Sequence, residues 1–98
     1  MLGFVFTPTA ERDMAWFDYY YDDIFPEGKQ RGKNRLKASI NLLCANPNLG
    51  KKAIDQSSAK EFSIQKTPFS LIYRVEKNTL IIMRVFDQRS LFANERIQ

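Results

Sequence analysis

The chain has 98 residues, of which 44% are hydrophobic and 27% charged, proportions that fit one globular domain able to fold without disulfides or metal ions. It contains no histidine, which excludes imidazole acid–base chemistry, Ser-His and Cys-His nucleophile pairs and the commonest zinc sites, so we expect neither a metal nor a cofactor. A net charge of +4 favours a polyanion or an acidic protein as partner.

An apolar segment opens the chain at residues 2–6. It lacks a basic leader and runs directly into Pro8 and charged residues, so we expect a first strand and not a signal peptide. No other stretch is long and uncharged enough to span a bilayer. We therefore expect a protein without a membrane partner.

Two helices are expected next, as an antiparallel hairpin. The first follows Thr7-Pro8-Thr9 and carries apolar residues at helical spacing: Ala10, Met14, Phe17, Tyr21 and Ile24. After Pro26-Glu27-Gly28, the second has its stripe at Leu36, Ile40 and Leu43 and ends at the Pro- and Gly-containing residues 46–50. Lys29 and Lys33 lie close to that stripe, which indicates that the tip of the hairpin extends beyond the core.

Several residues of the hairpin have two interpretations. The adjacent acids Asp22 and Asp23 point about 100° apart on a helix, so we expect a solvated flank and not a metal site. Trp16 and Tyr20 lie one turn apart and off the main stripe, where they either stack on a partner or are partly buried under the C-terminal tail. Cys44, the single cysteine, is expected in the core and fits a reduced, cytoplasmic environment.

Strands follow the helices. Residues 51–59 are polar and are expected to be irregular, after which apolar residues alternate in a strand at 62–65 and continue in strands at 69–75 and 79–86. The expected order is β-α-α-β-β-β. It describes an α+β fold in which a four-stranded, mainly antiparallel sheet holds the N-terminal helical hairpin on one face, in a single domain at residues 1–98.

The register of the last hairpin decides which side chains share a face. A three-residue loop at 76–78, closed by Asn78 in the left-handed region, keeps Arg84 out of the core and is therefore favoured. It places on the core face Phe69, Leu71, Tyr73, Val75, Ile81, Met83 and Val85. The opposite face then carries Ser70, Ile72, Arg74, Leu80, Ile82, Arg84 and Phe86, a mixture of arginines and aliphatic residues typical of a partner-binding surface.

Three segments together resemble a known superfamily. They are Asn-Pro-Asn-Leu-Gly-Lys at residues 46–51, Phe-Ser-Leu-Ile-Tyr-Arg-Val at 69–75 and Ile-Met-Arg-Val-Phe-Asp-Gln-Arg at 82–89. In this order, after a helical hairpin, they are similar to the ParE/RelE superfamily of toxins from bacterial type II toxin–antitoxin systems. The resemblance implies a curved antiparallel sheet packed on a helical hairpin, and an antitoxin as partner.

The resemblance leaves the target open. RelE-like members cut mRNA in the ribosomal A site, whereas ParE-like members poison DNA gyrase without cutting. Where the nucleases commonly carry an arginine, a basic residue and a tyrosine, this chain has Ser70, Asp87 and Phe92. We therefore expect a ParE-like growth inhibitor acting on gyrase, with a ribosome-dependent endonuclease and a non-toxic, antitoxin-binding or operon-regulating module as alternatives.

The candidate site residues follow from this interpretation. Antitoxin binding is expected at Ile72, Leu80, Ile82 and Phe86, and target binding at Arg74, Arg84, Arg89, Arg31 and Arg35. If the chain is a nuclease, the candidates are Arg74, Arg84, Arg89, Tyr73 and Lys60, with Glu76 a further candidate for proton transfer. Buried pairing with Glu76 or Asp87 would explain Arg74, Arg84 and Arg89 equally well, and a solvated helix would explain the basic stretch that holds Arg31 and Arg35.

Overall fold

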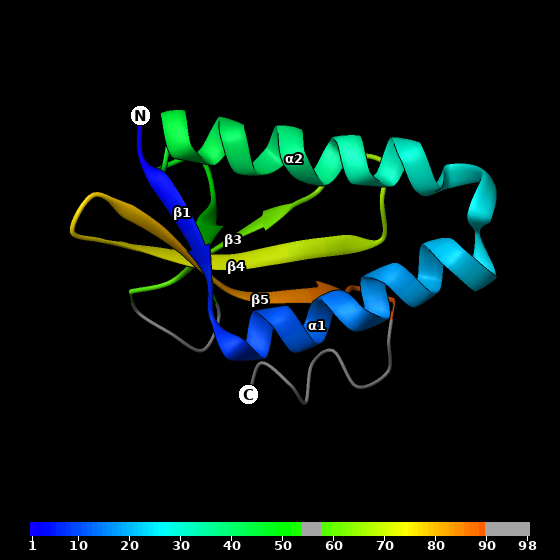
Figure 1. The fold of residues 1–98 in the computed structure, drawn as a ribbon. Helices are drawn as coiled ribbons and strands as arrows, with labels where there is room; N and C mark the ends of the chain where they lie inside the picture. Colours follow the sequence, from blue (N-terminus) through cyan, green and yellow to red (C-terminus); the bar gives the residue numbers. More distant parts are fainter. Residues whose placement is uncertain (54–57, 90–98) are drawn as a thin grey trace.

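A computed structural model describes residues 1–53 and 58–89. Two helices joined by short helical turns lie beside a five-stranded sheet (Figure 1). The elements are β1 (Gly3–Phe6), α1 (Pro8–Tyr19), the π-helix η1 (Tyr20–Ile24), the 3₁₀ helix η2 (Pro26–Gly28), α2 (Lys29–Ala45), β2 (Lys51–Lys52), β3 (Lys60–Ser63), β4 (Phe69–Glu76) and β5 (Thr79–Asp87).

The sheet has the strand order β1-β5-β4-β3-β2, and β1 runs parallel to β5 while the other pairs are antiparallel. This confirms the α+β architecture and the mainly antiparallel sheet. The expectation of four strands was wrong by one short strand: Lys51 and Lys52 pair with Glu61 and Lys60 in the segment expected to be irregular. Two residues held by backbone bonds alone leave no periodic signal in the sequence.

The first helix begins as expected and ends differently. The Thr7 hydroxyl accepts a hydrogen bond from the Ala10 N–H at 3.1 Å, and Pro8 occupies the first turn. In η1 the Phe25 N–H donates to the Tyr20 carbonyl at 2.8 Å, one residue farther along the chain than in an α-helix. The wider turn displaces the residues that follow Tyr20, so Ile24, expected in the core, is 53% exposed, while Tyr20 and Tyr21 are both buried.

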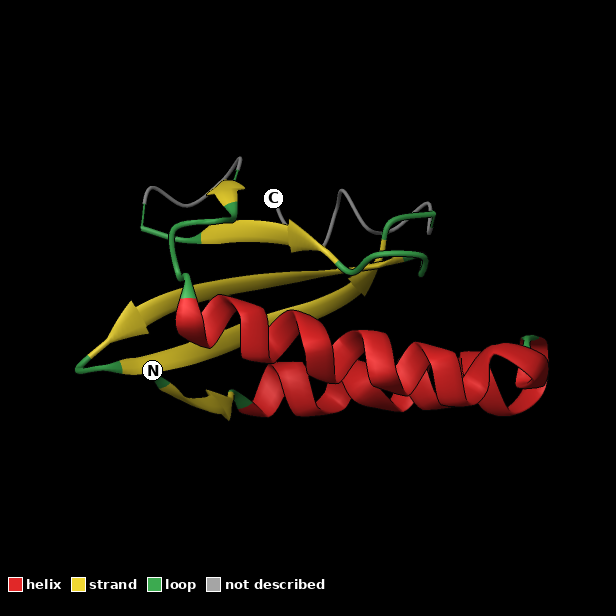
Figure 2. Ribbon diagram, turned by 90° about the horizontal axis from the view of Figure 1, so that it is seen from above, coloured by secondary structure: helices red, strands yellow, loops and turns green. Residues whose placement is uncertain are grey.

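The second helix confirms the predicted stripe, because Leu36, Ile40, Leu43 and Cys44 are all buried. Near the start of α2 the backbone comes very close to η1: a Cβ on Gly32 would lie 2.5 Å from the Tyr21 ring. The helices therefore pack on each other at the tip of the hairpin, which projects past the end of the sheet (Figure 2).

The register of the β4–β5 hairpin differs from the prediction. Lys77 and Asn78 both have positive φ, 49° and 61°, and Glu76 pairs with Thr79, so the turn has two residues and not three. A bulge on β5 then shifts the register, because Ile72 pairs with Arg84 whereas Tyr73 pairs with Ile82. The bulge keeps Arg84 out of the core, as the sequence pattern predicted. Because the turn has two residues, Leu80 and Ile82 face the main core in place of Ile81 and Met83.

Two groups of buried side chains result. The main core lies between the helices and one face of the sheet and includes Phe17, Leu43, Phe69, Leu80 and Ile82. The smaller one lies on the other face and comprises Ala53, Ala59, Ile72 and Phe86, with Met83 packed against it. The expectation that Ile81 and Met83 lie in the main core was therefore wrong, and both are half-buried.

Candidate functional site

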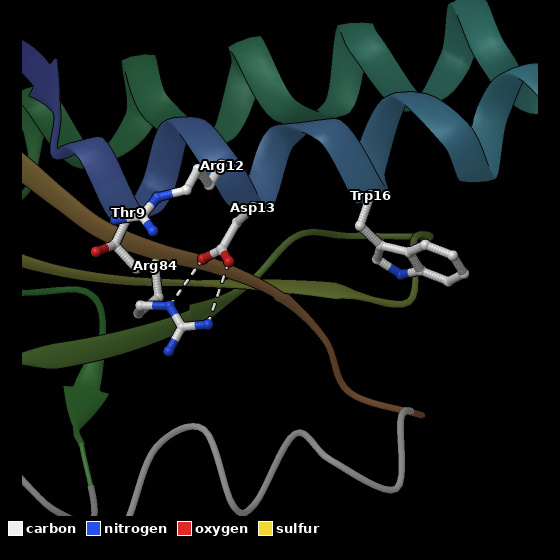
Figure 3. A pocket seen from close by; sticks show the side chains of 5 residues that line it. All are labelled: Thr9, Arg12, Asp13, Trp16 and Arg84. Carbon is white, nitrogen blue, oxygen red and sulfur yellow. Dashed lines mark hydrogen bonds and ion pairs between the residues drawn. The ribbon is translucent and has the colours of Figure 1, made fainter.

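Arg84 lies on β5 and faces α1, where it meets a carboxylate (Figure 3). Its Nε and Nη2 donate to the two oxygens of Asp13 at 2.8 and 3.1 Å, and the Val85 N–H donates to the same carboxylate at 3.0 Å. The side chains are 20% and 9% exposed. Asp13 thus neutralises Arg84 and ties α1 to the strand beside the bulge.

This pair forms part of a hollow of about 290 Å³ lined by Thr9, Arg12, Asp13, Trp16 and Arg84 (Figure 3). Four of these five side chains are polar. Asp13 was not predicted as a site residue from the sequence, although a signal was available. It lies three residues after Ala10 and four before Phe17, which places it on the apolar stripe of the helix. A carboxylate in such a position needs a partner.

Arg74 on β4 and Arg89, just after β5, also pair with carboxylates. Arg74 donates through Nε to Glu76, and Arg89 contacts Asp87 at 3.2 Å while its guanidinium carbon lies 4.8 Å from the centre of the Tyr20 ring. Glu76 and Asp87 are the partners expected from the sequence, but the Arg74–Glu76 pair is exposed and not buried. Arg74, Arg84 and Arg89 are therefore each paired with a different acid.

Asp87 organises the end of β5. It is buried and accepts hydrogen bonds from the Trp16 indole at 3.3 Å and from the backbone and side chain of Arg89. Burial raises the pKa of this carboxyl, but the bonds from Arg89 and Trp16 outweigh burial and leave the pKa below its usual value. Trp16, which the sequence placed on a partner surface or under the tail, is thereby fixed to the sheet.

Tyr73 is fully buried and connects two of the segments that carry the family resemblance. Its hydroxyl donates to the Pro47 carbonyl at 2.7 Å and accepts from the Gly50 N–H at 2.9 Å. A Cβ on Gly50 would lie 2.5 Å from that hydroxyl and 2.9 Å from the Glu61 carbonyl oxygen, so the loop requires glycine there. Burial raises the Tyr73 pKa further from neutrality, which makes it unsuitable for proton transfer.

Lys60, Tyr73 and Arg74 do come together, as three of the residues lining a second hollow of about 290 Å³ between β3, β4 and the loop that follows α2. Ser70 is not part of it. The Ser70 hydroxyl is buried and bonds to Ser63 and Gln88. Phe92, the third departure from the nuclease pattern, lies outside the described residues.

The residues expected to bind an antitoxin are not on an open surface. Leu80 and Ile82 are 0% exposed in the main core, because the two-residue turn places them on the helix face. Ile72 and Phe86 are on the expected face but are buried, in one cluster with Ala53 and Ala59. Their predicted exposure was wrong.

Arg31 and Arg35 lie on α2, a different element from those that hold the other candidate arginines. Arg35 lines a groove of about 190 Å³ between α2 and the region of β3. The apolar residues of this groove, Leu42 and Phe62, were not singled out from the sequence, since the stripe of the second helix was assigned only to its buried side.

Within residues 1–53 and 58–89, no helix is long and apolar enough to cross a membrane. In the same residues no group of three or more Cys, Asp or Glu is arranged to hold a metal ion.

Comparisons with known proteins agree with this geometry. A family model described as the ParE toxin of type II toxin–antitoxin systems, parDE, matches residues 4–92. A structure of the chromosomal ParDE system from P. aeruginosa superposes with a TM-score of 0.70 at 23% identity, covering 89% of this chain and 96% of that one. No curated protein gave a significant match.

Two other solved structures have the same fold. For YafQ from E. coli strain BL21(DE3) the TM-score is 0.64 at 16% identity, with 95% of this chain and all of that one covered (100%). The isolated E. coli RelE toxin gives 0.60 at 15% identity, covering 99% of this chain and 96% of that one. At these identities the likeness establishes the fold and not the target.

Proposed function

Because this chain belongs to the ParE toxin family of type II toxin–antitoxin systems, we propose that it inhibits bacterial growth by poisoning DNA gyrase. A cognate antitoxin is its partner and neutralises it. Action on gyrase would place the protein in the cytoplasm. The alternative within the same fold is cleavage of mRNA on the ribosome.

The observation that supports gyrase is the pairing of the strand arginines. Cleaving a phosphodiester without a metal needs cations free to stabilise charge on the phosphate and a group able to transfer protons. Here the Arg84 guanidinium is held in a bidentate contact by Asp13, and Arg74 and Arg89 pair with Glu76 and Asp87. Trapping gyrase on broken DNA needs a complementary surface and no titrating side chain.

One observation favours the nuclease as a second candidate. Lys60, Tyr73 and Arg74 line one hollow, which would place two cations beside a bound phosphate. Against it, the Tyr73 hydroxyl is already occupied by Pro47 and Gly50, and the chain has no histidine. Of the two cations Arg74 is already paired with Glu76, so the hollow offers Lys60 but no hydroxyl free to transfer a proton.

Expression in bacteria without antitoxin tests the proposal. We expect a DNA-damage response and double-strand breaks while bulk translation continues at first, and we expect Lys60→Ala to remain toxic because the nuclease hollow has no part in the effect. Rapid arrest of translation with A-site mRNA fragments, lost in Lys60→Ala and Arg74→Ala, would instead establish the nuclease. Unaffected growth with a soluble, folded protein would identify a non-toxic antitoxin-binding module.

A further inference from the structure

The antitoxin needs an accessible apolar surface, and the surface predicted from the sequence is not available. Leu80 and Ile82 are inside the main core, and Ile72 and Phe86 are buried. Among the described residues, Leu42 is one of the large apolar side chains left in contact with water, 44% exposed. It lies on α2, at the groove described above.

The groove runs between the helix and the sheet and holds about 190 Å³. It is lined by Arg35, Ala38, Ser39, Leu42, Phe62 and Gln65. The four α2 residues have the spacing i, i+3, i+4 and i+7, so they share one face of the helix. Phe62 packs against the main core, which fixes the wall opposite Leu42. The result is a preformed apolar recess with one guanidinium at its rim.

A second arginine extends this positive rim. Arg31 precedes Arg35 by four residues, about 6 Å along the helix axis, and lies on the same face. In the described part of the chain neither forms an ion pair with a carboxylate, and α2 itself contains no acidic residue. Their charges are therefore not balanced from within the helix.

The start of α2 adds to the imbalance. Arg31 lies in the first turn, where the helix dipole disfavours a cation, and the N-cap residue Gly28 supplies no side-chain hydrogen bond. The first turn contains no acid, and the nearby Asp22 pairs with Lys29 and not with Arg31. Carboxylates from another molecule would relieve the unfavourable charge at this end of the helix.

The hollow at Asp13 differs from the α2 groove in its charge balance and in the polarity of its lining. There the Arg84 side chain is neutralised by Asp13, and most of the lining residues are polar. The α2 groove combines an apolar recess with unbalanced guanidinium groups, which is the composition of a protein-binding hot spot. A nucleic acid would use the cations but would leave Leu42 and the Phe62 wall exposed to its phosphates.

We propose that this groove is a docking site for the cognate antitoxin, which inserts one large apolar side chain between Leu42 and Phe62 and directs acidic side chains at Arg35 and Arg31. The inference rests on the part of the proposed function that gives the chain an antitoxin, and it is independent of gyrase. An antitoxin segment of this composition complements the basic face of α2 in charge and the recess in shape.

The test measures binding of the full-length cognate antitoxin to purified variants of the whole chain. Leu42→Asp and the double variant Arg31→Glu/Arg35→Glu should each weaken binding by at least about tenfold. Added salt should weaken binding of the wild type, with a smaller effect on the double variant. The matched controls are Leu49→Asp, another exposed leucine, and Arg12→Glu, at the Asp13 hollow. Both should bind like the wild type.

Thermal melting of each free variant establishes that it is folded, and Leu42→Ser serves if Leu42→Asp is not. Affinity changed by less than about twofold in folded Leu42 and arginine variants would overturn the inference. Loss of toxicity with unchanged antitoxin binding would also overturn it, because the groove would then belong to the target. Weakened antitoxin binding by a chain that does not affect gyrase would support the groove while refuting the gyrase proposal.

Discussion

At the scale of single residues, carboxylates decide what the arginines can do. Asp13 takes three hydrogen bonds from Arg84 and the backbone of Val85. Asp87 holds both Arg89 and Trp16. Through Asp13–Arg84 and Trp16–Asp87, these acids join α1 to β5. Removing either acid should therefore lower the stability of the fold.

The Asp87→Asn variant tests this role through pH. The pKa of Asp87 is held below its usual value in the folded protein, so its ionised form stabilises the fold above about pH 4, the range of an unfolded aspartate, and this stabilisation is lost as the pH falls through the folded pKa. We expect Asp87→Asn to lower the free energy of unfolding by about 1 to 3 kcal/mol at neutral pH. The difference from the wild type should narrow below about pH 4.

Urea unfolding at several pH values measures this difference, with the exposed Asp23→Asn as the control that should change little. A difference that stays constant from neutral pH into the acid range would show that the Asp87 charge does not contribute.

The sequence could predict part of this residue-scale picture. It offered Glu76 and Asp87 as partners for the strand arginines because they lie two residues from Arg74 and Arg89, and those pairs are present. It did not offer Asp13 for Arg84, since that pair joins residues 71 apart and depends on the crossing of α1 over β5. The Tyr73 contact with the loop at Pro47 likewise exists only after the strands are in register.

At the scale of elements, the turn at Lys77 and Asn78 determines which face of β5 enters the core. A two-residue turn with both residues in the left-handed region matches the twist of the hairpin. The sequence pointed to Asn78 and not to Lys77, because a lysine adopts positive φ at a cost that only the hairpin as a whole offsets. The bulge opposite Ile72 and Tyr73 has no marker such as glycine, so the register beyond it could not be predicted.

Replacing the turn by the favoured pair tests this account. The double variant Lys77→Asn/Asn78→Gly removes the strain at both positive-φ positions, and we expect a gain of about 0.5 to 1 kcal/mol, or roughly 2 to 8 °C in Tm. Differential scanning calorimetry measures it. Were residues 76–78 a three-residue loop, forcing a two-residue turn would displace the strands, and Tm would fall.

At the scale of the whole molecule, charge is divided between the two arms of the helical hairpin. The first arm, α1 to η2, holds the acids Glu11, Asp13, Asp18, Asp22, Asp23 and Glu27, and α2 holds Lys29, Arg31, Lys33, Arg35 and Lys37. Lys29 pairs with Asp22 across the tip, which leaves the basic excess farther along α2. One molecule thus presents a basic groove for an acidic partner beside an arm of opposite charge.

The order of elements, except the short strand β2, and the packing of the hairpin on the sheet could be predicted from the sequence because periodicity and the turns at residues 26–28 and 46–50 are local signals. Which face each strand buries, and which acid meets Arg84, could not, since they depend on a bulge and on contacts between distant segments. The expected antitoxin surface was wrong at Leu80 and Ile82 for this reason, whereas Ile72 and Phe86 lie on the expected face but are buried there. The groove at Leu42 was found only in the structure.

The central claim, that this ParE-family chain acts on gyrase, is tested most directly with purified components. The chain is added to gyrase, ATP and supercoiled plasmid, and cleaved DNA is measured after the proteins are denatured. We expect linear plasmid to accumulate with increasing toxin, to depend on gyrase, and to disappear when cognate antitoxin is added first. Plasmid that stays intact under these conditions, together with mRNA cut on programmed ribosomes by the same preparation, would contradict the account.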